Sequence, residues 1–126
     1  MKKKSVLIID SDPVFQILIT QLLREEHLIT EFSFSGMHAL SLLNREDYDM
    51  IILDYFLPDL LGHEVLTIIK DNEKFHQIPV VVVSASGNDK IREEVLSCGA
   101  SYFLDKPVSI NFLKDVFSEF HIISKI

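Results

Sequence analysis

The sequence predicts an α/β fold, an open and doubly wound parallel sheet of five strands with helices on both faces. Short apolar runs alternate with segments of helical periodicity along the chain, which is the pattern of repeated strand–helix units. Three of the runs are apolar at every position, as in strands buried on both faces, and two look like edge strands. Right-handed connections between parallel strands then leave few possible strand orders.

The first expected strand is Val6–Ile9, a continuous apolar run rich in β-branched residues. The first helix is expected to begin at Pro13, because Asp12 before it is a typical capping residue and proline suits the first helical position. The second strand, Ile29–Phe34, alternates like an edge strand and places Phe34 on its apolar side.

The second helix is expected after Ser35–Gly36, where apolar residues follow at helical spacing. The third strand, Met50–Leu53, is apolar throughout and ends at Asp54. Beyond Gly62, another helical pattern of apolar residues predicts the third helix.

The last two strand–helix units follow the same rules. Pro79–Val83 is a buried strand that ends at Ser84, and Asn88–Cys98 is a helix stopped by a glycine. Tyr102–Leu104 is a short final strand, and Ser109 caps the fifth helix.

Length and composition indicate one acidic globular domain over residues 1–126. The chain is 48% hydrophobic and 25% charged, with a net charge of −7. Such a surface repels a phosphate backbone, so we expect no direct binding to nucleic acid. The apolar runs are too short to cross a membrane, and the single cysteine, Cys98, excludes a disulfide framework. We therefore expect a cytoplasmic protein without a membrane partner.

Polar side chains follow the expected strands at the edge where ligands bind in such sheets. They are Asp10, Ser11 and Asp12 after the first strand, Asp54 after the third, Ser84 after the fourth and Lys106 after the fifth. Crowded carboxylates stay ionised only beside a cation, and hard oxygen ligands select Mg²⁺. One carboxylate can then attack an activated phosphoryl group, whose oxygens the ammonium and hydroxyl can hold. The simpler alternative is that a strand-end acid only caps the next helix, as Asp12 could.

From Val6 to Phe120 the chain resembles a response regulator receiver domain of the CheY type. The motifs that carry the resemblance are Ser35–Leu40, Tyr48–Asp54, Leu57–Gly62, Val83–Ala85, Cys98–Ala100 and Phe103–Pro107. Together with the acid cluster, their order along the chain is specific, although no single motif is decisive. The resemblance implies a flavodoxin-like (βα)5 fold with strand order 2-1-3-4-5.

The resemblance also implies roles for individual residues. Asp54 would accept a phosphoryl group, Lys106 would pair with that aspartate and then with the phosphoryl group, and Ser84 would donate a hydrogen bond to it. Phe103 would be the switch aromatic that turns between outward and inward positions. The main-chain carbonyl of Phe56 would be a metal ligand, and the Lys106–Pro107 bond would be cis.

One departure from the family pattern concerns the metal. The family usually has two adjacent acids after the first strand, whereas here Ser11 follows Asp10 and the next acid is Asp12. Because serine is a neutral and weaker ligand, we expect the magnesium set of Asp10, Asp12, Asp54 and the Phe56 carbonyl to bind Mg²⁺ weakly, with Ser11 a weak ligand or none.

The partners implied are those of a two-component phosphorelay. A sensor histidine kinase or a histidine phosphotransfer protein would supply the phosphoryl group, and an unknown downstream protein would read the switch. The chain would thus be a signalling switch and not an enzyme proper. The fourth helix, last strand and fifth helix form the usual output face of the family and could also form a homodimer, with Ile91, Tyr102, Ile110 and Phe112 as candidate contacts.

Two alternative functions remain open from the sequence. Val6–Phe15 also resembles the first motif of haloacid-dehalogenase-type phosphatases, in which Asp10 would be the nucleophile and Asp12 the acid. Against this alternative, that family places its metal-binding acids on a late strand, whereas Asp54 precedes Ser84 here, and it needs a longer chain. The second alternative is a degenerate receiver that binds partners without phosphorylation, for which Ser11 is the only support.

Overall fold

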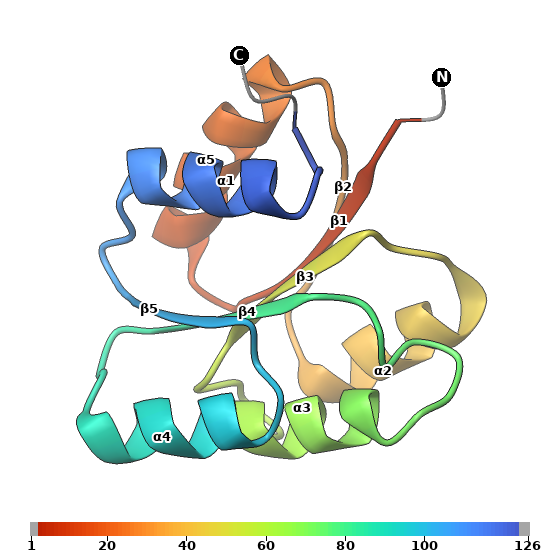
Figure 1. Ribbon diagram of the computed structural model, residues 1–126, viewed down its shortest axis with the longest axis vertical. Helices are drawn as coiled ribbons and strands as arrows, with labels where there is room; N and C mark the ends of the chain where they lie inside the picture. The colour runs from red at the N-terminus through yellow and green to blue at the C-terminus, as the bar shows by residue number, and fades with distance from the viewer. Residues whose placement is uncertain (1–2, 124–126) are drawn as a thin grey trace.

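Five parallel strands form one sheet in the order β2-β1-β3-β4-β5 (Figure 1). The computed structural model describes residues 3–123 of the chain. The strands are β1 (Ser5–Ile9), β2 (Ile29–Ser33), β3 (Met50–Asp54), β4 (Val80–Ser84) and β5 (Tyr102–Asp105). The helices are α1 (Pro13–Glu25), α2 (Gly36–Arg45), α3 (Gly62–Lys70), α4 (Asp89–Ser97) and α5 (Ile110–Glu119). The predicted fold class and strand order are confirmed.

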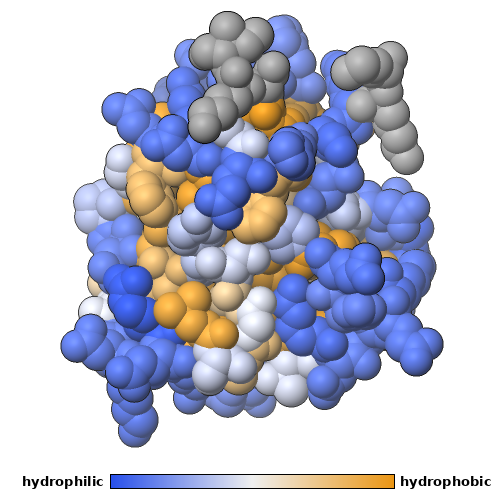
Figure 2. All heavy atoms as spheres, in the orientation of Figure 1, coloured by the Kyte–Doolittle hydropathy of each residue, from blue (hydrophilic) through white to orange (hydrophobic). Residues whose placement is uncertain are grey.

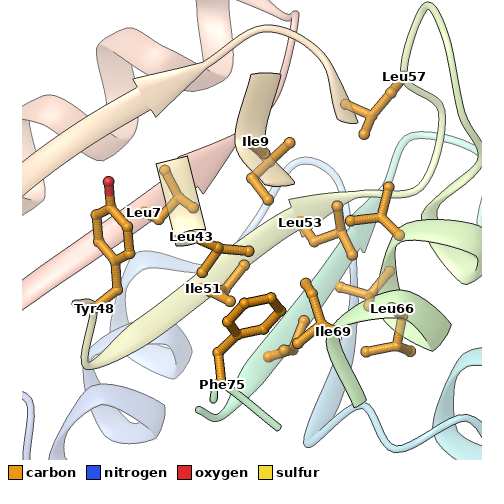
Figure 3. Close-up of a cluster of buried hydrophobic side chains, with 14 of the residues drawn as sticks. Leu7, Ile9, Leu43, Tyr48, Ile51, Leu53, Leu57, Leu66, Ile69 and Phe75 are labelled. Atoms are coloured by element: carbon orange, nitrogen blue, oxygen red, sulfur yellow. The ribbon is translucent and has the colours of Figure 1, made fainter. Parts of the chain in front are cut away.

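Helices cover both faces of the sheet, α1 and α5 on one side and α2, α3 and α4 on the other (Figure 1). Each face has its own apolar cluster, because successive side chains of a strand point to opposite faces. On β1, Leu7 joins the cluster under α2 and α3, while Ile8 joins the cluster under α1 and α5. Figure 3 shows the first of these clusters, with Leu53 on the sheet side and Leu66 on the helix side.

The three central strands are buried along almost their whole length. Every residue of β3 and β4 is buried, and so are four of the five residues of β1. Continuous burial on both faces explains why these strands are apolar without alternation. The sheet therefore holds the ends of β1, β3 and β4 at fixed positions, which matters for the polar residues located there.

The edge strand β2 differs from its predicted pattern at its end. Phe34 lies beyond the strand and is 57% exposed, whereas the preceding Ser33 is fully buried. The Ser33 hydroxyl donates to the Ser35 carbonyl at 3.0 Å and lies 2.9 Å from Nδ1 of His38. The prediction that Phe34 lies on the apolar side is wrong, because the chain turns into α2 after Ser33 and these contacts satisfy the buried hydroxyl.

Side-chain caps fix where the helices begin. The residues that accept a hydrogen bond from a backbone N–H in the first turn are Asp12 for α1, Ser35 for α2, Asn88 for α4 and Ser109 for α5. The caps predicted at Asp12 and Ser109 are thus present. No helix in the described part of the chain is long and apolar enough to cross a membrane. On the face seen in Figure 2, apolar side chains reach the surface mainly in the middle, with hydrophilic ones around them.

Candidate functional site

The predicted polar residues meet at the carboxyl edge of the sheet. Asp10 follows β1, Asp54 ends β3, Ser84 ends β4 and Lys106 follows β5. The chain turns from β1 outward to β2 and then returns to place β3 on the other side of β1. In open parallel sheets this reversal of direction leaves a crevice at the carboxyl ends of the strands.

Lys106 lies at the centre of the acidic cluster. Its Nζ is 2.9 Å from Oδ2 of Asp10, 3.4 Å from Oδ2 of Asp12 and 3.6 Å from Oδ2 of Asp54. It also lies 4.7 Å from the centre of the Phe15 ring, whose face attracts a cation. Burial lowers the pKa of Lys106, but the three carboxylates, with Asp10 the strongest, outweigh burial and raise it. The lysine therefore stays protonated in this site.

Asp10 and Asp54 differ in their access to solvent. Asp10 is fully buried and Asp54 is 6% exposed, whereas the side chain of Asp12 is 41% exposed. Burial and then the charge of Asp10 raise the pKa of Asp54 to about 6, against the opposing effects of Lys106 and of the Phe56 N–H. Asp54 is thus a buried carboxylate whose ionisation is opposed by burial and by its neighbour Asp10. The burial of Asp10 disfavours a phosphatase reaction in which Asp10 attacks a phosphate ester.

One buried oxygen of the site lacks a hydrogen bond. Oδ1 of Asp10 accepts the N–H of Asp12 at 2.7 Å. Its Oδ2 is close enough to the Lys106 ammonium for an ion pair, yet it is the one buried side-chain polar atom in residues 3–123 without a hydrogen-bond partner. The ion pair with Lys106, at 2.9 Å, is the main interaction of this oxygen. A carboxylate oxygen can accept more than one interaction, so Oδ2 of Asp10 can also accept a hydrogen bond or bind a cation.

The oxygen atoms of the site fit a hard cation in part. Asp10 and Asp54 supply two carboxylates beside the Phe56 backbone, which are the ligands that Mg²⁺ prefers. Within residues 3–123, however, no three His, Cys, Asp or Glu side chains are grouped so that they could hold a metal by themselves. Asp12 uses Oδ1 to cap α1 at Val14, and Ser11 is exposed. A cation here would depend on backbone and water oxygens as well as on the two carboxylates.

The other predicted residues surround this cluster. Ser84 is fully buried, and its Oγ accepts the N–H of Ser86 at 3.2 Å. The ring of Phe103 is only 4% exposed, with the Arg92 guanidinium 5.0 Å from the ring centre. The Phe56 side chain is 46% exposed, and its N–H donates to Oδ1 of Asp54 at 3.3 Å.

A shallow groove of about 260 Å³ opens beside Lys106. Its lining is mainly apolar but includes two charged residues of the site, and consists of Asp12, Val14, Phe15, Leu18, Ala85, Lys106, Pro107 and Val108. The groove thus runs between α1 and the segment that follows β5, where the Lys106–Pro107 peptide bond is cis as expected.

Sequence reasoning missed two residues that shape the site. Phe15 is buried and lies beneath the Lys106 ammonium, a role that the sequence did not indicate. Asp59 accepts hydrogen bonds from the N–H groups of Gly36 and Met37, which are more than 20 residues away in the chain. No local pattern announces such contacts, because both partners come together only through the tertiary fold.

Comparison with known proteins gives a consistent result. The family model of the response regulator receiver domain matches residues 6–118. The two-component response regulator ORR11 of Oryza sativa subsp. indica is 35% identical over 114 residues, which cover 90% of this chain and 78% of that protein. The polar-differentiation response regulator DivK of Brucella ovis is 31% identical over 107 residues, which cover 85% of this chain and 87% of that protein.

A solved structure is similar over nearly the same length. The receiver domain of the sensor histidine kinase PA1611 from Pseudomonas aeruginosa superimposes with a TM-score of 0.85 at 25% identity. The match covers 94% of this chain and 98% of that one. That structure has a magnesium ion coordinated in its active-site cleft.

Proposed function

The chain belongs to the family of response regulator receiver domains, and from this premise we propose that Asp54 accepts a phosphoryl group from a phosphohistidine. The donor is a sensor histidine kinase or a histidine phosphotransfer protein. Receiver domains are signalling switches, and here phosphorylation changes the binding of a downstream protein. We treat residues 1–126 as one such domain and place it in the cytoplasm.

The position of Asp54 is the observation that carries the proposal. Asp54 is 6% exposed, whereas Asp10 is fully buried, and Lys106 lies 3.6 Å from Oδ2 of Asp54. A nucleophilic carboxylate must be ionised, and the ammonium favours the ionised form against burial and the charge of Asp10. Asp10, which is fully buried, serves to hold Lys106.

The transfer exchanges one bond to phosphorus for another. An oxygen of the Asp54 carboxylate forms a P–O bond while the P–N bond of the phosphohistidine breaks. The bonding pair goes to the imidazole nitrogen, which takes a proton from solvent and leaves as neutral imidazole. The Lys106 ammonium and the Ser84 hydroxyl, both at this edge of the sheet, donate to oxygens of the transferred group.

Asp10, Asp54 and the carbonyl of Phe56 would hold Mg²⁺, which when bound neutralises charge on the phosphoryl oxygens. Support comes from the acceptor capacity that remains on the ion-paired oxygen of Asp10 and from the Asp54 carboxylate beside the Phe56 backbone. Because Ser11 contributes no charge and Asp12 caps α1, the binding is weaker than in a site with two adjacent acids.

The groove beside Lys106 is where the segment that carries the phosphohistidine docks. Its apolar lining from α1 leads directly to the ammonium group of the site. The exposed side chains of Phe56 and Leu61 add apolar contacts on the rim. These apolar residues around the charged groups of the site can contact the apolar face of a helix whose phosphohistidine reaches Asp54.

The downstream response depends on Phe103 and the face made by α4, β5 and α5. Ile91, Tyr102, Ile110 and Phe112 lie on this face, and Phe112 is 42% exposed. Phosphorylation would change the position of Phe103 beneath α4 and thus the shape of the face. A protein target or a second copy of the chain would bind there, whereas the net charge of −7 disfavours nucleic acid.

The test is covalent labelling with a small acyl phosphate or phosphoramidate donor in the presence of Mg²⁺. Intact mass measurement should show one base-labile phosphoryl adduct on the wild-type chain and none on Asp54→Asn. The matched control, Asp115→Asn, removes the same charge from an exposed position on α5 and should label normally.

The same experiment separates the alternatives. An adduct on Asp10, together with turnover of a generic phosphate ester, would indicate a phosphatase. Absence of any adduct on a folded wild-type chain would indicate a degenerate receiver and would refute the proposal.

A further inference from the structure

The loop between β3 and α3 carries the Phe56 carbonyl and is closed at its base. The N–H of Gly62 donates to the Tyr55 carbonyl at 2.6 Å, and Phe56 pairs with Leu61 in a short antiparallel bridge. A Cβ atom at Gly62 would lie 2.7 Å from the Cα of Tyr55, so the two ends of the loop approach closely. Because the bridge links Phe56 to Leu61, a contact made by the residues between them also bears on the position of the Phe56 carbonyl.

Asp59 at the tip binds the first turn of α2. Its Oδ1 accepts the N–H of Gly36 at 2.8 Å, and its Oδ2 accepts the N–H of Met37 at 2.9 Å. Both amides lack partners within the helix, and the positive end of the helix dipole favours a carboxylate there. Leu60 packs against the same turn, since a Cβ atom at Gly36 would lie 2.9 Å from its Cδ1.

The first turn of α2 is itself tied to the β1 side of the site. Ser33, just before this turn, donates its hydroxyl to the Ser35 carbonyl at 3.0 Å. The Ser33 carbonyl accepts the N–H of Asp10 at 2.9 Å. A continuous set of hydrogen bonds therefore runs from Asp59 through the start of α2 to the backbone of Asp10.

We propose that Asp59 is a positioning residue for the cation site: by binding the start of α2, it holds the Phe56 carbonyl at a fixed place relative to Asp10. The inference rests on the proposed function, because the Phe56 carbonyl is a ligand only if the site binds Mg²⁺. The effect is large in this chain because Ser11 contributes no charge. A backbone carbonyl then makes up a larger share of the oxygen set, and its position matters more.

Magnesium titration of four proteins tests the inference. The dissociation constant for Mg²⁺ is measured from backbone amide shifts by NMR for the wild type, Asp59→Ala, Asp59→Asn and Asp115→Ala. We expect Asp59→Ala to weaken binding about fivefold, as for the loss of a helix-capping contact. Asp59→Asn should lie between Asp59→Ala and the wild type, because an amide oxygen accepts one of the two bonds. Asp115→Ala removes the same charge from α5 and should bind like the wild type.

Thermal melting in EDTA separates positioning from general stability. If Asp59 only stabilises the fold, Asp59→Ala lowers the melting temperature and leaves the dissociation constant unchanged, which overturns the inference. If Asp59→Ala does not fold, the test rests on Asp59→Asn. A dissociation constant for Asp59→Asn equal to that of the wild type then overturns the inference.

Labelling of Asp54 separates this inference from the proposed function. If the wild type is labelled on Asp54 and the Asp59 variants bind Mg²⁺ as tightly as the wild type, only the role of Asp59 is refuted. A wild type that neither binds Mg²⁺ nor is labelled refutes the proposed function as well.

Discussion

The ammonium group of Lys106 faces the carboxylates of Asp10, Asp12 and Asp54 at the carboxyl edge of the sheet. One positive charge cannot balance three negative ones, so the metal-free site remains anionic. The raised pKa of Asp54 is a direct result, since burial and then Asp10 oppose its ionisation. The excess of negative charge favours a bound cation, in line with the proposed magnesium site and with Asp54 as the proposed acceptor.

Restoring an acid at position 11 should strengthen metal binding. We expect Ser11→Asp to lower the dissociation constant for Mg²⁺ about tenfold, because ligand charge is a main determinant of affinity for hard cations. Amide shifts in a Mg²⁺ titration measure the effect. Ser118→Asp, which adds the same charge on α5, should leave the affinity almost unchanged, and equal affinities in both variants would contradict a ligand position at residue 11.

Removing the charge of Asp54 should stabilise the metal-free protein at neutral pH. The pKa of Asp54 is about 6 in the folded chain and 3.8 for an unperturbed group, so its ionisation costs folding free energy as pH rises from about 4 to 6. At pH 7 in EDTA, we expect Asp54→Asn to raise the free energy of unfolding by about 1–3 kcal/mol.

The difference should disappear below about pH 3, where Asp54 is protonated in both the folded and the unfolded state. Urea unfolding at several pH values checks the sign, with Asp115→Asn as the control for loss of an exposed charge. A less stable Asp54→Asn at pH 7 would show that the Lys106 pair outweighs burial and repulsion by Asp10.

At the scale of elements, short loops join rigid strands to helices at the site. The β3–α3 loop depends on the absence of a side chain at Gly62, where the start of α3 approaches the backbone of Tyr55. The β4–α4 loop also contains a glycine, Gly87, but there an added Cβ would meet the exposed carboxylate of Asp105. The Asp105 side chain can rotate away from an added Cβ at position 87, whereas the Tyr55 backbone at the end of β3 cannot move away from one at position 62.

Alanine substitutions at the two glycines should therefore differ. We expect Gly62→Ala to lower the free energy of unfolding by about 1–3 kcal/mol, as typical for overpacking against a fixed neighbour. Gly87→Ala should cost less than about 1 kcal/mol, because the Asp105 carboxylate can swing into solvent. Chemical denaturation of both variants measures the contrast, and equal losses would show that the β3–α3 loop shifts to accept a methyl group.

At the scale of the whole molecule, two separate apolar layers hold the helices on the sheet. The layer under α1 and α5 includes Phe117, which is fully buried, whereas Phe112 on the same helix is 42% exposed. Phe112 packs edge-on against Tyr102, with ring centres 5.9 Å apart. One helix thus uses one phenylalanine for the core and presents another on the surface.

The two phenylalanines of α5 should contribute very differently to stability. We expect Phe117→Ala to cost about 3–5 kcal/mol, because it removes a buried ring and leaves a cavity. Phe112→Ala should cost less than about 1 kcal/mol of stability. Urea unfolding curves compare the two, and a similar loss for both would indicate that the surface contact with Tyr102 is part of the core.

The sequence alone determined the fold class, the order of elements and the edge of the sheet where the polar residues meet. Periodicity, capping residues and apolar runs are local properties, so Pro13, Asp12 and Met50–Leu53 already indicate their roles. Because parallel strands align their carboxyl ends, the meeting of Asp10, Asp54 and Lys106 at one edge also followed from the predicted parallel sheet.

Only the tertiary structure decided which groups pair within that site. It buried Asp10 completely and left a small part of Asp54 exposed, put Phe15 beneath Lys106, turned Phe34 outward and joined Asp59 to the start of α2. Such pairings depend on how connections pack helices against the sheet, and residues such as Gly36 and Asp59 are distant in the chain. Local patterns predict which elements form, whereas contacts between distant residues depend on how these elements pack together.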